Sequence, residues 1–273
     1  MEIFLSFLSI AFALLGVGYF IVFLFRNLLE PFYILLFNRP IFVHFYPYPK
    51  HLDPAHVAVL NNEFNFYQNL TPTRKGYFRH RVATFMVRYR FVGGGGLTVT
   101  DEMKVRIAVV SVMLTFGMRR YLYRVFSTII IYPDVFPSRS DDNFHKGEFN
   151  PAAKAIVFSW KHFLEGLQHD SDNLNLGLHE FAHALHFDSL RKQRRGSSAA
   201  IYKDGFNNIL VYLGKPSNRQ QLIDAGYLRE YAYTNQHEFV AVVLEYFFET
   251  PEEFRQRLPE LHEIVKRMIN FRD

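Results

Sequence analysis

The most informative stretch of this sequence is Asn173-Leu-Asn-Leu-Gly-Leu-His179-Glu180-Phe-Ala-His183-Ala-Leu-His186-Phe-Asp188. It contains the spacing His-Glu-x-x-His, and residues four apart on an α-helix lie on the same face. His179 and His183 can therefore present two imidazole nitrogens to one metal ion, which is half of a zinc site. Glu180 is offset from both histidines, so its carboxylate can reach a metal-bound water without itself being a ligand.

The surroundings of this motif favour zinc over histidines that are satisfied by ordinary hydrogen bonds. Apolar side chains flank the histidines and predict a mostly buried helix: Leu176, Leu178, Phe181, Ala182, Leu185 and Phe187. Two histidines and a glutamate in such a helix are each costly to bury without a partner. A metal ion is the simplest partner that all three can share, and zinc with Glu180 as proton acceptor would generate a hydroxide-like nucleophile.

A second stretch offers candidates for the third protein ligand that a catalytic zinc site usually has. Asn235 has the character of a helix N-cap, and Glu238 follows at the spacing of a capping box, which is the ordinary structural explanation for Glu238. Glu238 and Glu245 nevertheless share one face of a strongly apolar helix, so we expect both to point inward. Buried carboxylates need strong partners, which would be zinc for one and a ligand histidine or backbone donor for the other.

Composition limits the class of protein. The chain has 273 residues, of which 49% are hydrophobic, enough for one sizeable core and a separate hydrophobic segment. It contains no cysteine, which excludes a disulfide framework and thiolate zinc ligands. The net charge of +5 is modest and the basic residues are scattered among acidic ones, so we expect no nucleic-acid partner.

The N-terminus predicts a membrane anchor within residues 1–27. The 23 residues from Ile3 to Phe25 carry no charge and are long enough to cross a bilayer as a helix. A cleaved signal peptide is the main alternative, but Glu2 stands where a basic region should be and the run is too long. Basic residues follow the run: Arg26, Arg39 and Lys50. The positive-inside rule therefore predicts a single-pass anchor in the inner membrane, with the rest of the chain in the cytoplasm.

Residues 28–50 are expected to be an interfacial segment and linker, and residues 51–273 one domain. Apolar residues from Leu28 to Phe45 are interrupted by charges and prolines, which makes a second span the poorer alternative. The helices expected in the domain are 53–69, 78–90 (helical or mixed) and 102–116, with a turn at 71–76. The strands expected are 125–132 and 155–160, separated by a polar surface loop at 141–150. Residues 155–160 fit an edge strand beside the metal helix and an interior strand equally well.

Taken together, several segments resemble the MtfA family of zinc-dependent peptidases, the Mlc titration factor group within the glutamate-zincins. The segments that carry the resemblance are Ile131–Phe136, Ile156–Trp160, Asn175–Leu185, Tyr231–Tyr233, Glu238–Val242, Glu245–Phe248 and Pro251–Glu252. The resemblance covers most of residues 51–273 and implies an α+β, zincin-like metallopeptidase domain. It also implies that His179, His183 and Glu238 bind zinc, that Glu180 is the general base, and that Tyr231 donates to the developing oxyanion.

The sequence departs from the family pattern at three places. His186 stands where the family usually has an aspartate, and the nearest acid is Asp188, so the surroundings of the ligand histidines are expected to differ. Some members use an upstream histidine to block the zinc at rest, and His145 is the closest equivalent, the alternative being a plain loop histidine. The N-terminal anchor is the third departure. The basic run Arg191–Arg195 is either a solvated turn or a contact with anionic lipid.

The function expected from the sequence is zinc-dependent peptide hydrolysis, and the resemblance implies aminopeptidase-like action on short peptides. The main alternative, by analogy with the family, is a zinc-containing binding protein that sequesters a transcriptional repressor. A third interpretation, a structural membrane protein with a vestigial site, predicts no zinc at all. The remaining histidines His162, His169 and His237 have no partner at ligand spacing and are expected to be surface or core residues.

Overall fold

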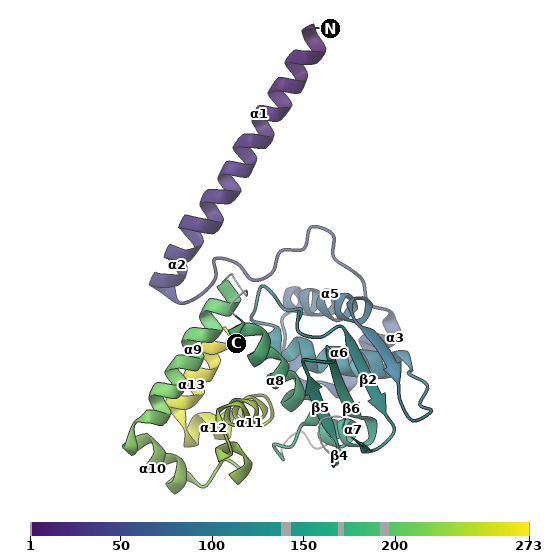
Figure 1. Ribbon diagram of the computed structural model, residues 1–273, viewed down its shortest axis with the longest axis vertical. Helices are drawn as coiled ribbons and strands as arrows, with labels where there is room; N and C mark the ends of the chain where they lie inside the picture. Colours follow the sequence, from purple (N-terminus) through teal and green to yellow (C-terminus); the bar gives the residue numbers. More distant parts are fainter. Residues whose placement is uncertain (1, 138–142, 169–171, 192–196, 273) are drawn as a thin grey trace.

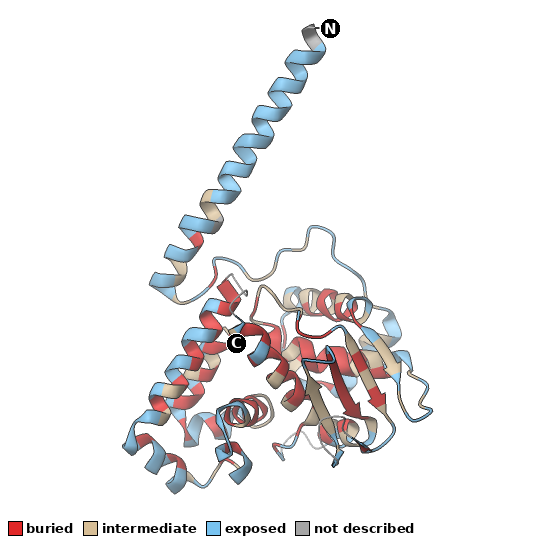
Figure 2. Cartoon of the chain, viewed as in Figure 1, coloured by how far each residue is buried: buried red, intermediate tan, exposed pale blue. Residues whose placement is uncertain are grey.

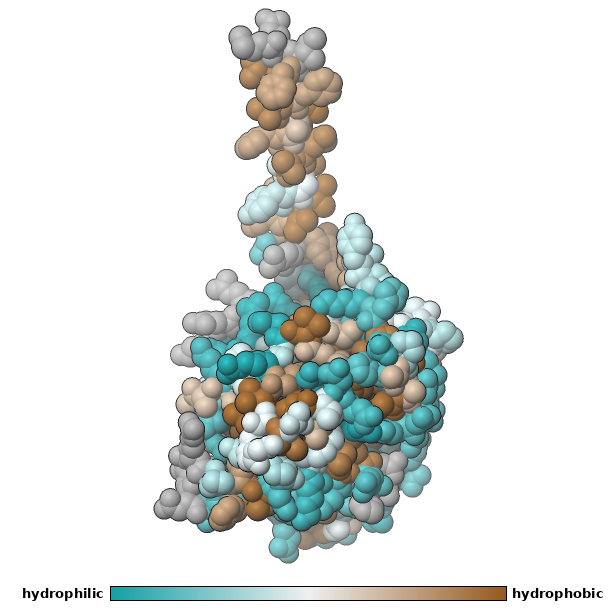
Figure 3. Space-filling model, turned by 90° about the vertical axis from the view of Figure 1, so that its right-hand side faces the viewer, coloured by the Kyte–Doolittle hydropathy of each residue, from teal (hydrophilic) through white to brown (hydrophobic). Residues whose placement is uncertain are grey.

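The computed structural model of the protein describes residues 2–137, 143–168, 172–191 and 197–272. The chain begins with one long helix that projects from the rest of the molecule (Figure 1). It consists of α1 (Glu2–Leu24), a π-helical turn η1 (Phe25–Leu29) and α2 (Glu30–Phe37). Phe4–Phe37 is long and apolar enough to cross a membrane. Most of its described residues are exposed (Figure 2), and Figure 3 shows mainly hydrophobic side chains along this projecting helix. A signal sequence near an N-terminus passes the same test.

The helix continues beyond the run expected from the sequence and is attached to the domain at its end. Pro31 lacks an N–H, and the wide π-helical turn that precedes it accommodates this interruption. Glu30 is buried, with its Oε1 atom 2.5 Å from a guanidinium nitrogen of Arg119. Asn38 ends α2 in the left-handed conformation (φ 46°) and donates to Asp204 at 3.1 Å. These contacts fix where the long helix meets the domain.

The domain contains the following elements in chain order: α3 (Pro54–Glu63), α4 (Asn65–Gln68), α5 (Pro72–Arg88), β1 (Arg90–Gly93), α6 (Asp101–Thr115), β2 (Thr128–Tyr132), β3 (Phe136–Pro137), β4 (Phe144–His145), β5 (Gly147–Asn150), β6 (Ala155–Ser159), α7 (Trp160–Gln168), α8 (Leu176–Leu190), α9 (Ser197–Gly214), α10 (Pro216–Ala225), the 3₁₀ helix η2 (Glu230–Tyr233), α11 (Gln236–Glu249), α12 (Pro251–Arg257) and α13 (Pro259–Met268). This mixture of helices with small sheets confirms the predicted α+β class.

Two helix boundaries differ from the sequence prediction. The helix expected at 53–69 starts as predicted, with Asp53 as N-cap, but is interrupted at Phe64, whose backbone is extended. The turn expected at 71–76 was wrong, because Thr71 caps α5 and Pro72 occupies its first turn. Proline after a capping threonine is a start signal for a helix as well as a turn signal, and here the helical alternative holds.

A four-stranded sheet with the order β1-β2-β6-β5 lies on one side of the domain (Figure 1). β1, β2 and β6 are parallel, and β5 runs antiparallel to β6 at one edge. All five residues of β6 are buried, so Ala155–Ser159 is an interior strand. The surface loop expected at 141–150 was wrong for most of its described residues, because Phe144–His145 forms β4 and Gly147–Asn150 forms the edge strand β5.

The core lies between the sheet and the central helices α6, α8 and α11. Phe181 on α8 is fully buried, and aromatic rings surround it at centroid distances of 5.5 to 6.2 Å: Phe85, Tyr123, Phe126 and Phe158. The helices from α9 to α13 gather on the side of α8 that faces away from the sheet (Figure 1). Helix α8 is therefore held from both sides, which fixes the position of the residues it carries.

Candidate metal centre and active site

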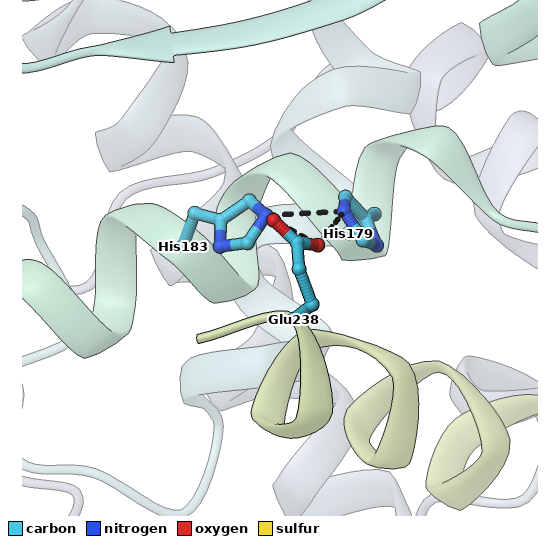
Figure 4. A group of neighbouring side chains, drawn as sticks. All are labelled: His179, His183 and Glu238. Atoms are coloured by element: carbon cyan, nitrogen blue, oxygen red, sulfur yellow. Dashed lines mark hydrogen bonds and ion pairs between the residues drawn. The ribbon is translucent and has the colours of Figure 1, made fainter. Parts of the chain in front are cut away.

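Two packed helices bring the three predicted ligands together. Helix α8 starts at Asn175, whose side chain accepts from the N–H of Leu178, and presents His179 and His183 on one face. Helix α11 packs against α8 and contributes Glu238 from its first turn. Figure 4 shows the three side chains pointing toward one another. Their ligand atoms lie within 4.8 Å of each other, the only such group of three found in the described residues.

The spacing of these atoms fits a metal ion. Glu238 Oε2 lies 3.1 Å from His179 Nε2 and 3.4 Å from His183 Nε2, and the two Nε2 atoms are 3.0 Å apart. Ligands about 2.0–2.1 Å from a tetrahedral ion are themselves roughly 3.3 Å apart. Glu238 Oε2 is buried and makes no hydrogen bond of normal geometry within the described residues. Two imidazoles and one carboxylate that converge in this way can hold a divalent cation.

The ring of His179 is oriented by a carboxylate from α11. Glu245 Oε1 lies 2.6 Å from His179 Nδ1, and Glu245 is itself held by Arg229 at 2.6 Å and by the backbone N–H of Asn175 at 3.0 Å. This network assigns the proton of the neutral ring to Nδ1 and leaves the lone pair of Nε2 facing the ligand cluster. The prediction that Glu238 and Glu245 both point inward is therefore confirmed.

The charges of the cluster are strongly coupled. Burial lowers the pKa of His179, but the close carboxylates of Glu238 and Glu245 outweigh burial and raise that pKa to about 10. Burial raises the pKa of Glu238, yet the two histidines hold it well below its usual range. A divalent cation competes with the proton for Nε2, so metal binding would release that proton.

Glu180 lies on the side of α8 that faces the edge strand β5. Its side chain is buried, and the backbone N–H of Phe149 on β5 donates to it. Burial raises the pKa of Glu180, and the nearby His179 and His183 reduce this rise. A Cβ atom at Gly147 would lie 2.8 Å from Glu180 Oε1, so the absence of a side chain at this position makes room for the carboxylate.

The free edge of β5 faces this carboxylate. In an antiparallel ladder, the backbone groups of alternate residues hydrogen-bond to the neighbouring strand. The bond from Ser159 N–H to the carbonyl of Lys146 shows that Lys146, and therefore Glu148, bond to β6 in this way. The backbone groups of Gly147 and Phe149 therefore point away from β6, toward the open edge. The N–H of Phe149 is used by Glu180, whereas Gly147 lines the cleft beside this carboxylate.

Replacing Gly147 by alanine is expected to destabilise the protein by about 1–3 kcal/mol, because the new methyl group overlaps both Leu176 and Glu180. The change in the free energy of unfolding can be measured by denaturant titration. The matched control is Gly76→Ala on α5, where a Cβ meets nothing within 4 Å and alanine favours the helix. Equal stability of the two variants would contradict the close approach of β5 to Glu180.

Tyr231 lies at the mouth of the same site. It belongs to the 3₁₀ helix η2, is half-exposed, and its ring centroid is 5.9 Å from that of His179. Burial and the neighbouring Glu238 raise the pKa of Tyr231 to about 12, so the hydroxyl is protonated at neutral pH. Tyr231, Glu180 and His179 line a cleft of about 640 Å³.

Two contributors to the site were missed by the sequence analysis. Arg229 lines the cleft and binds Glu245, but no spacing rule links it to a residue 16 positions away. Gly147 was placed in a polar loop, and only the pairing of β5 with β6 brings it to Glu180. Both depend on contacts between elements that are distant in the sequence.

The other histidines considered in the sequence are not part of the ligand cluster, as far as the structure describes them. His145 is on β4, paired with Phe136, and is not one of the three converging residues. His186 contacts the hydroxyl of Tyr202 at 3.1 Å, and burial with His237 nearby lowers its pKa to about 4. His162 lies 2.7 Å from Ser159 Oγ. His169 and residues 192–195 of the basic run fall outside the described residues.

The acid nearest the motif in the sequence, Asp188, is not part of the ligand cluster. Asp188 is buried and accepts from the backbone N–H of Arg124 at 3.3 Å. The carboxylate that orients His179 is Glu245 of α11. The contact between Glu245 of α11 and His179 of α8 therefore orients the ring of His179.

The model of the glucose-regulated metallo-peptidase M90 family matches residues 47–269 of the chain. The chain belongs to this family. The match includes α8, η2 and α11, which carry the residues described above, and it confirms the resemblance inferred from the sequence segments.

Individual relatives in this metallo-peptidase group are distant in sequence. An uncharacterized protein of Synechocystis sp. is 26% identical over 252 residues, which cover 85% of this chain and 85% of the relative. Proteins named Mlc titration factor A are also similar. The one from Serratia proteamaculans is 26% identical over 63% of this chain and 70% of its own length. The one from Klebsiella pneumoniae is 26% identical over 71% of this chain and 77% of its own length.

Proposed function

We propose that the protein is a zinc-dependent peptidase, with zinc held by His179, His183 and Glu238 and with Glu180 as general base. The observation that carries this proposal is the convergence of the three ligand atoms beside a buried carboxylate that is not one of them. Two imidazoles and one carboxylate are a usual ligand set for catalytic zinc, and membership of a metallo-peptidase family supports the same chemistry.

The residues of the chain divide the reaction among them. Bound zinc would supply a Lewis acid that polarises the scissile carbonyl. Glu180 takes a proton from the attacking water and then delivers it to the leaving amine. The protonated hydroxyl of Tyr231 donates to the oxygen on which negative charge develops.

The open edge of β5 would bind the peptide as an additional strand. The backbone groups of Gly147 and Phe149 that face this edge can pair with an extended chain, which lays the scissile bond beside Glu180. Such pairing uses main-chain atoms and is therefore tolerant of substrate sequence.

The test of peptidase action uses the zinc-loaded full chain in detergent micelles with paired chromogenic substrates. An aminoacyl p-nitroanilide with a free amine and its N-acetylated form differ only at the N-terminus, which is a charged amine in the first and a neutral acetyl amide in the second. Aminopeptidase-like action predicts cleavage of the free amine and at least tenfold slower cleavage of the acetylated form. Equal cleavage of both would overturn the aminopeptidase assignment, and cleavage of neither would favour the binding role described below.

Tyr231→Phe is expected to lower kcat by roughly 10²-fold, because it removes a donor to the oxyanion while keeping the ring. Steady-state kinetics on the same substrate measures this loss, and KM should change little. Tyr233→Phe is the matched control, since Tyr233 lies on the same 3₁₀ helix and is exposed to a similar extent. Equal kcat in both variants would remove Tyr231 from the mechanism.

A regulatory binding function is the second candidate. Relatives named Mlc titration factor A suggest a protein partner such as a transcriptional repressor, with the metal serving structure. Under this alternative, Glu180→Gln would leave partner binding and cellular effect unchanged. A cellular effect that disappears with Glu180→Gln, while the partner still binds, would exclude sequestration as the whole function.

We further propose that residues 1–27 anchor the protein in the inner membrane as a single span, with residues 51–273 in the cytoplasm. The support is the 34-residue apolar helix and the basic residues that follow its first part. Because the chain has no cysteine, a single cysteine can be introduced at the exposed Tyr48 or Asp224. A membrane-impermeant maleimide should label these positions only after the cells are opened. Labelling of intact spheroplasts would show that these positions lie outside the cytoplasm and would contradict the proposed orientation.

A further inference from the structure

A second cavity lies behind the metal centre, on the other side of the contact between α7 and the start of α8. Its volume is about 490 Å³, which is within the range of small-molecule sites. Aromatic rings form much of its wall: Phe66, Phe248 and Phe271 lie with their centroids 6.0 to 6.1 Å from one another. Met113 and Leu178 are among the other apolar residues that line the cavity.

Three glutamates line the cavity, and two of them, Glu63 and Glu252, are paired with arginines. Glu249, the last residue of α11, lines the cavity, and both of its carboxylate oxygens are buried without a hydrogen bond of normal geometry within the described residues. Burial raises the pKa of Glu249 to about 8, although the side chain of Asn175 and the backbone of Asn173 act in the opposite direction. With this pKa the carboxyl group is mostly protonated in the empty cavity, and a cationic N–H donor bound beside it would favour the ionised form.

The aromatic rings and Glu249 therefore favour a ligand that carries an ammonium group. Aromatic faces attract cations, and a carboxylate supplies the hydrogen-bond acceptor that a primary ammonium needs. Basic residues also line the cavity: Arg74, Arg255, Lys266 and Arg272. Arg74 donates to the carbonyl of Arg272 and Arg255 pairs with Glu252, so two of the guanidinium groups are engaged within the protein.

The cavity and the active-site cleft share a thin wall. Gly166 lines both, and its carbonyl accepts from the side chain of Asn175 at 2.9 Å. A Cβ atom at Gly166 would lie 3.0 Å from the Cα of Asn175, which leaves no space between the two segments. The N–H of Asn175 binds Glu245, and Glu245 binds His179. Two hydrogen bonds thus separate the cavity wall from a metal ligand.

We propose that this cavity binds a small molecule with a primary ammonium group on an apolar body, and that its occupancy acts on the metal centre through Asn175 and Glu245. The ammonium pairs with Glu249 and the apolar body packs against Phe66, Phe248 and Phe271. A ligand bound in this cavity would regulate the peptidase, so this part of the inference rests on the function proposed above. Its binding step does not depend on peptidase activity.

Isothermal titration calorimetry of phenethylamine into the zinc-loaded full chain in micelles tests the binding step. The natural chain and Glu180→Gln should bind it equally, whereas Glu249→Gln and the cavity-filling Met113→Trp should bind it at least tenfold more weakly. Titrating the variants in the same micelles subtracts partitioning into detergent. Zinc content and far-ultraviolet circular dichroism establish that each variant is folded.

Two ligand analogues sharpen the experiment. Phenethyl alcohol lacks the charge and 3-phenylpropionate reverses it, and neither should match the affinity of phenethylamine. Tighter binding of the propionate, equal binding to Glu249→Gln, or no binding to the natural chain would each overturn the site. If phenethylamine binds but changes neither the zinc dissociation constant nor peptide turnover, the coupling through Asn175 is wrong. A protein without turnover still reports on the site through binding and zinc affinity.

Discussion

Glu180→Gln is expected to reduce kcat for peptide hydrolysis by roughly 10²–10⁴-fold while the metal stays bound. The amide has the shape of the carboxylate and can still accept from the backbone N–H of Phe149, but it cannot take a proton from water. The measurement is kcat on the preferred p-nitroanilide, together with zinc content by mass spectrometry on the same preparations.

A matched carboxylate serves as the control for this variant. Glu165 also lines the cleft but is exposed and is not one of the converging ligands, so Glu165→Gln should retain turnover. Loss of zinc in Glu180→Gln would mean that the carboxylate supports the ligand cluster instead of the chemistry. Full turnover in Glu180→Gln with zinc retained would remove Glu180 from the reaction.

His183→Ala is expected to abolish both tight zinc binding and the stabilisation that zinc provides. Removing one of three protein ligands leaves an incomplete site, and a metal that binds only the folded state stabilises it by about 4 kcal/mol at 1,000 times its dissociation constant. Thermal unfolding with and without a chelator measures how much bound zinc stabilises the folded state. The natural chain should lose stability on chelation, and the variant should be insensitive to it.

The control for His183→Ala is a histidine in the same cleft. His162 lies within reach of Ser159 and outside the ligand cluster, so His162→Ala should keep the dependence of stability on the chelator. Chelator-independent stability of the natural chain, or unchanged zinc affinity in His183→Ala, would contradict the assigned ligands.

The sequence was most informative about the relative positions of residues that lie on the same helix. The spacing of His179 and His183 needs only the geometry of an α-helix, and the apolar neighbours of the motif predict that α8 is buried. Glu238 followed from the resemblance and from its shared face with Glu245. The packing of α11 against α8 then brings its carboxylate within 3.4 Å of both imidazoles.

Features that depend on contacts between distant segments were not predictable from local patterns. Gly147–Asn150 has neither an apolar run nor a clear alternation, and it is a strand because β6 offers a partner. Arg229 is placed by its ion pair with Glu245, and the cavity beside Glu249 is lined by segments that lie far apart in the sequence, from Glu63 to Arg272. Thr71-Pro72 shows a different limit, since the same dipeptide is typical of turns and of helix starts.

The most direct test of the central claim is zinc K-edge X-ray absorption spectroscopy on the zinc-loaded full chain. The account predicts about one zinc per chain and a shell of nitrogen and oxygen ligands about 2.0–2.1 Å from the metal. Scattering from two imidazole rings should be present in the natural chain and fall to one ring in His183→Ala. Absence of bound zinc, or a shell without imidazole scattering, would contradict a zinc centre on His179, His183 and Glu238.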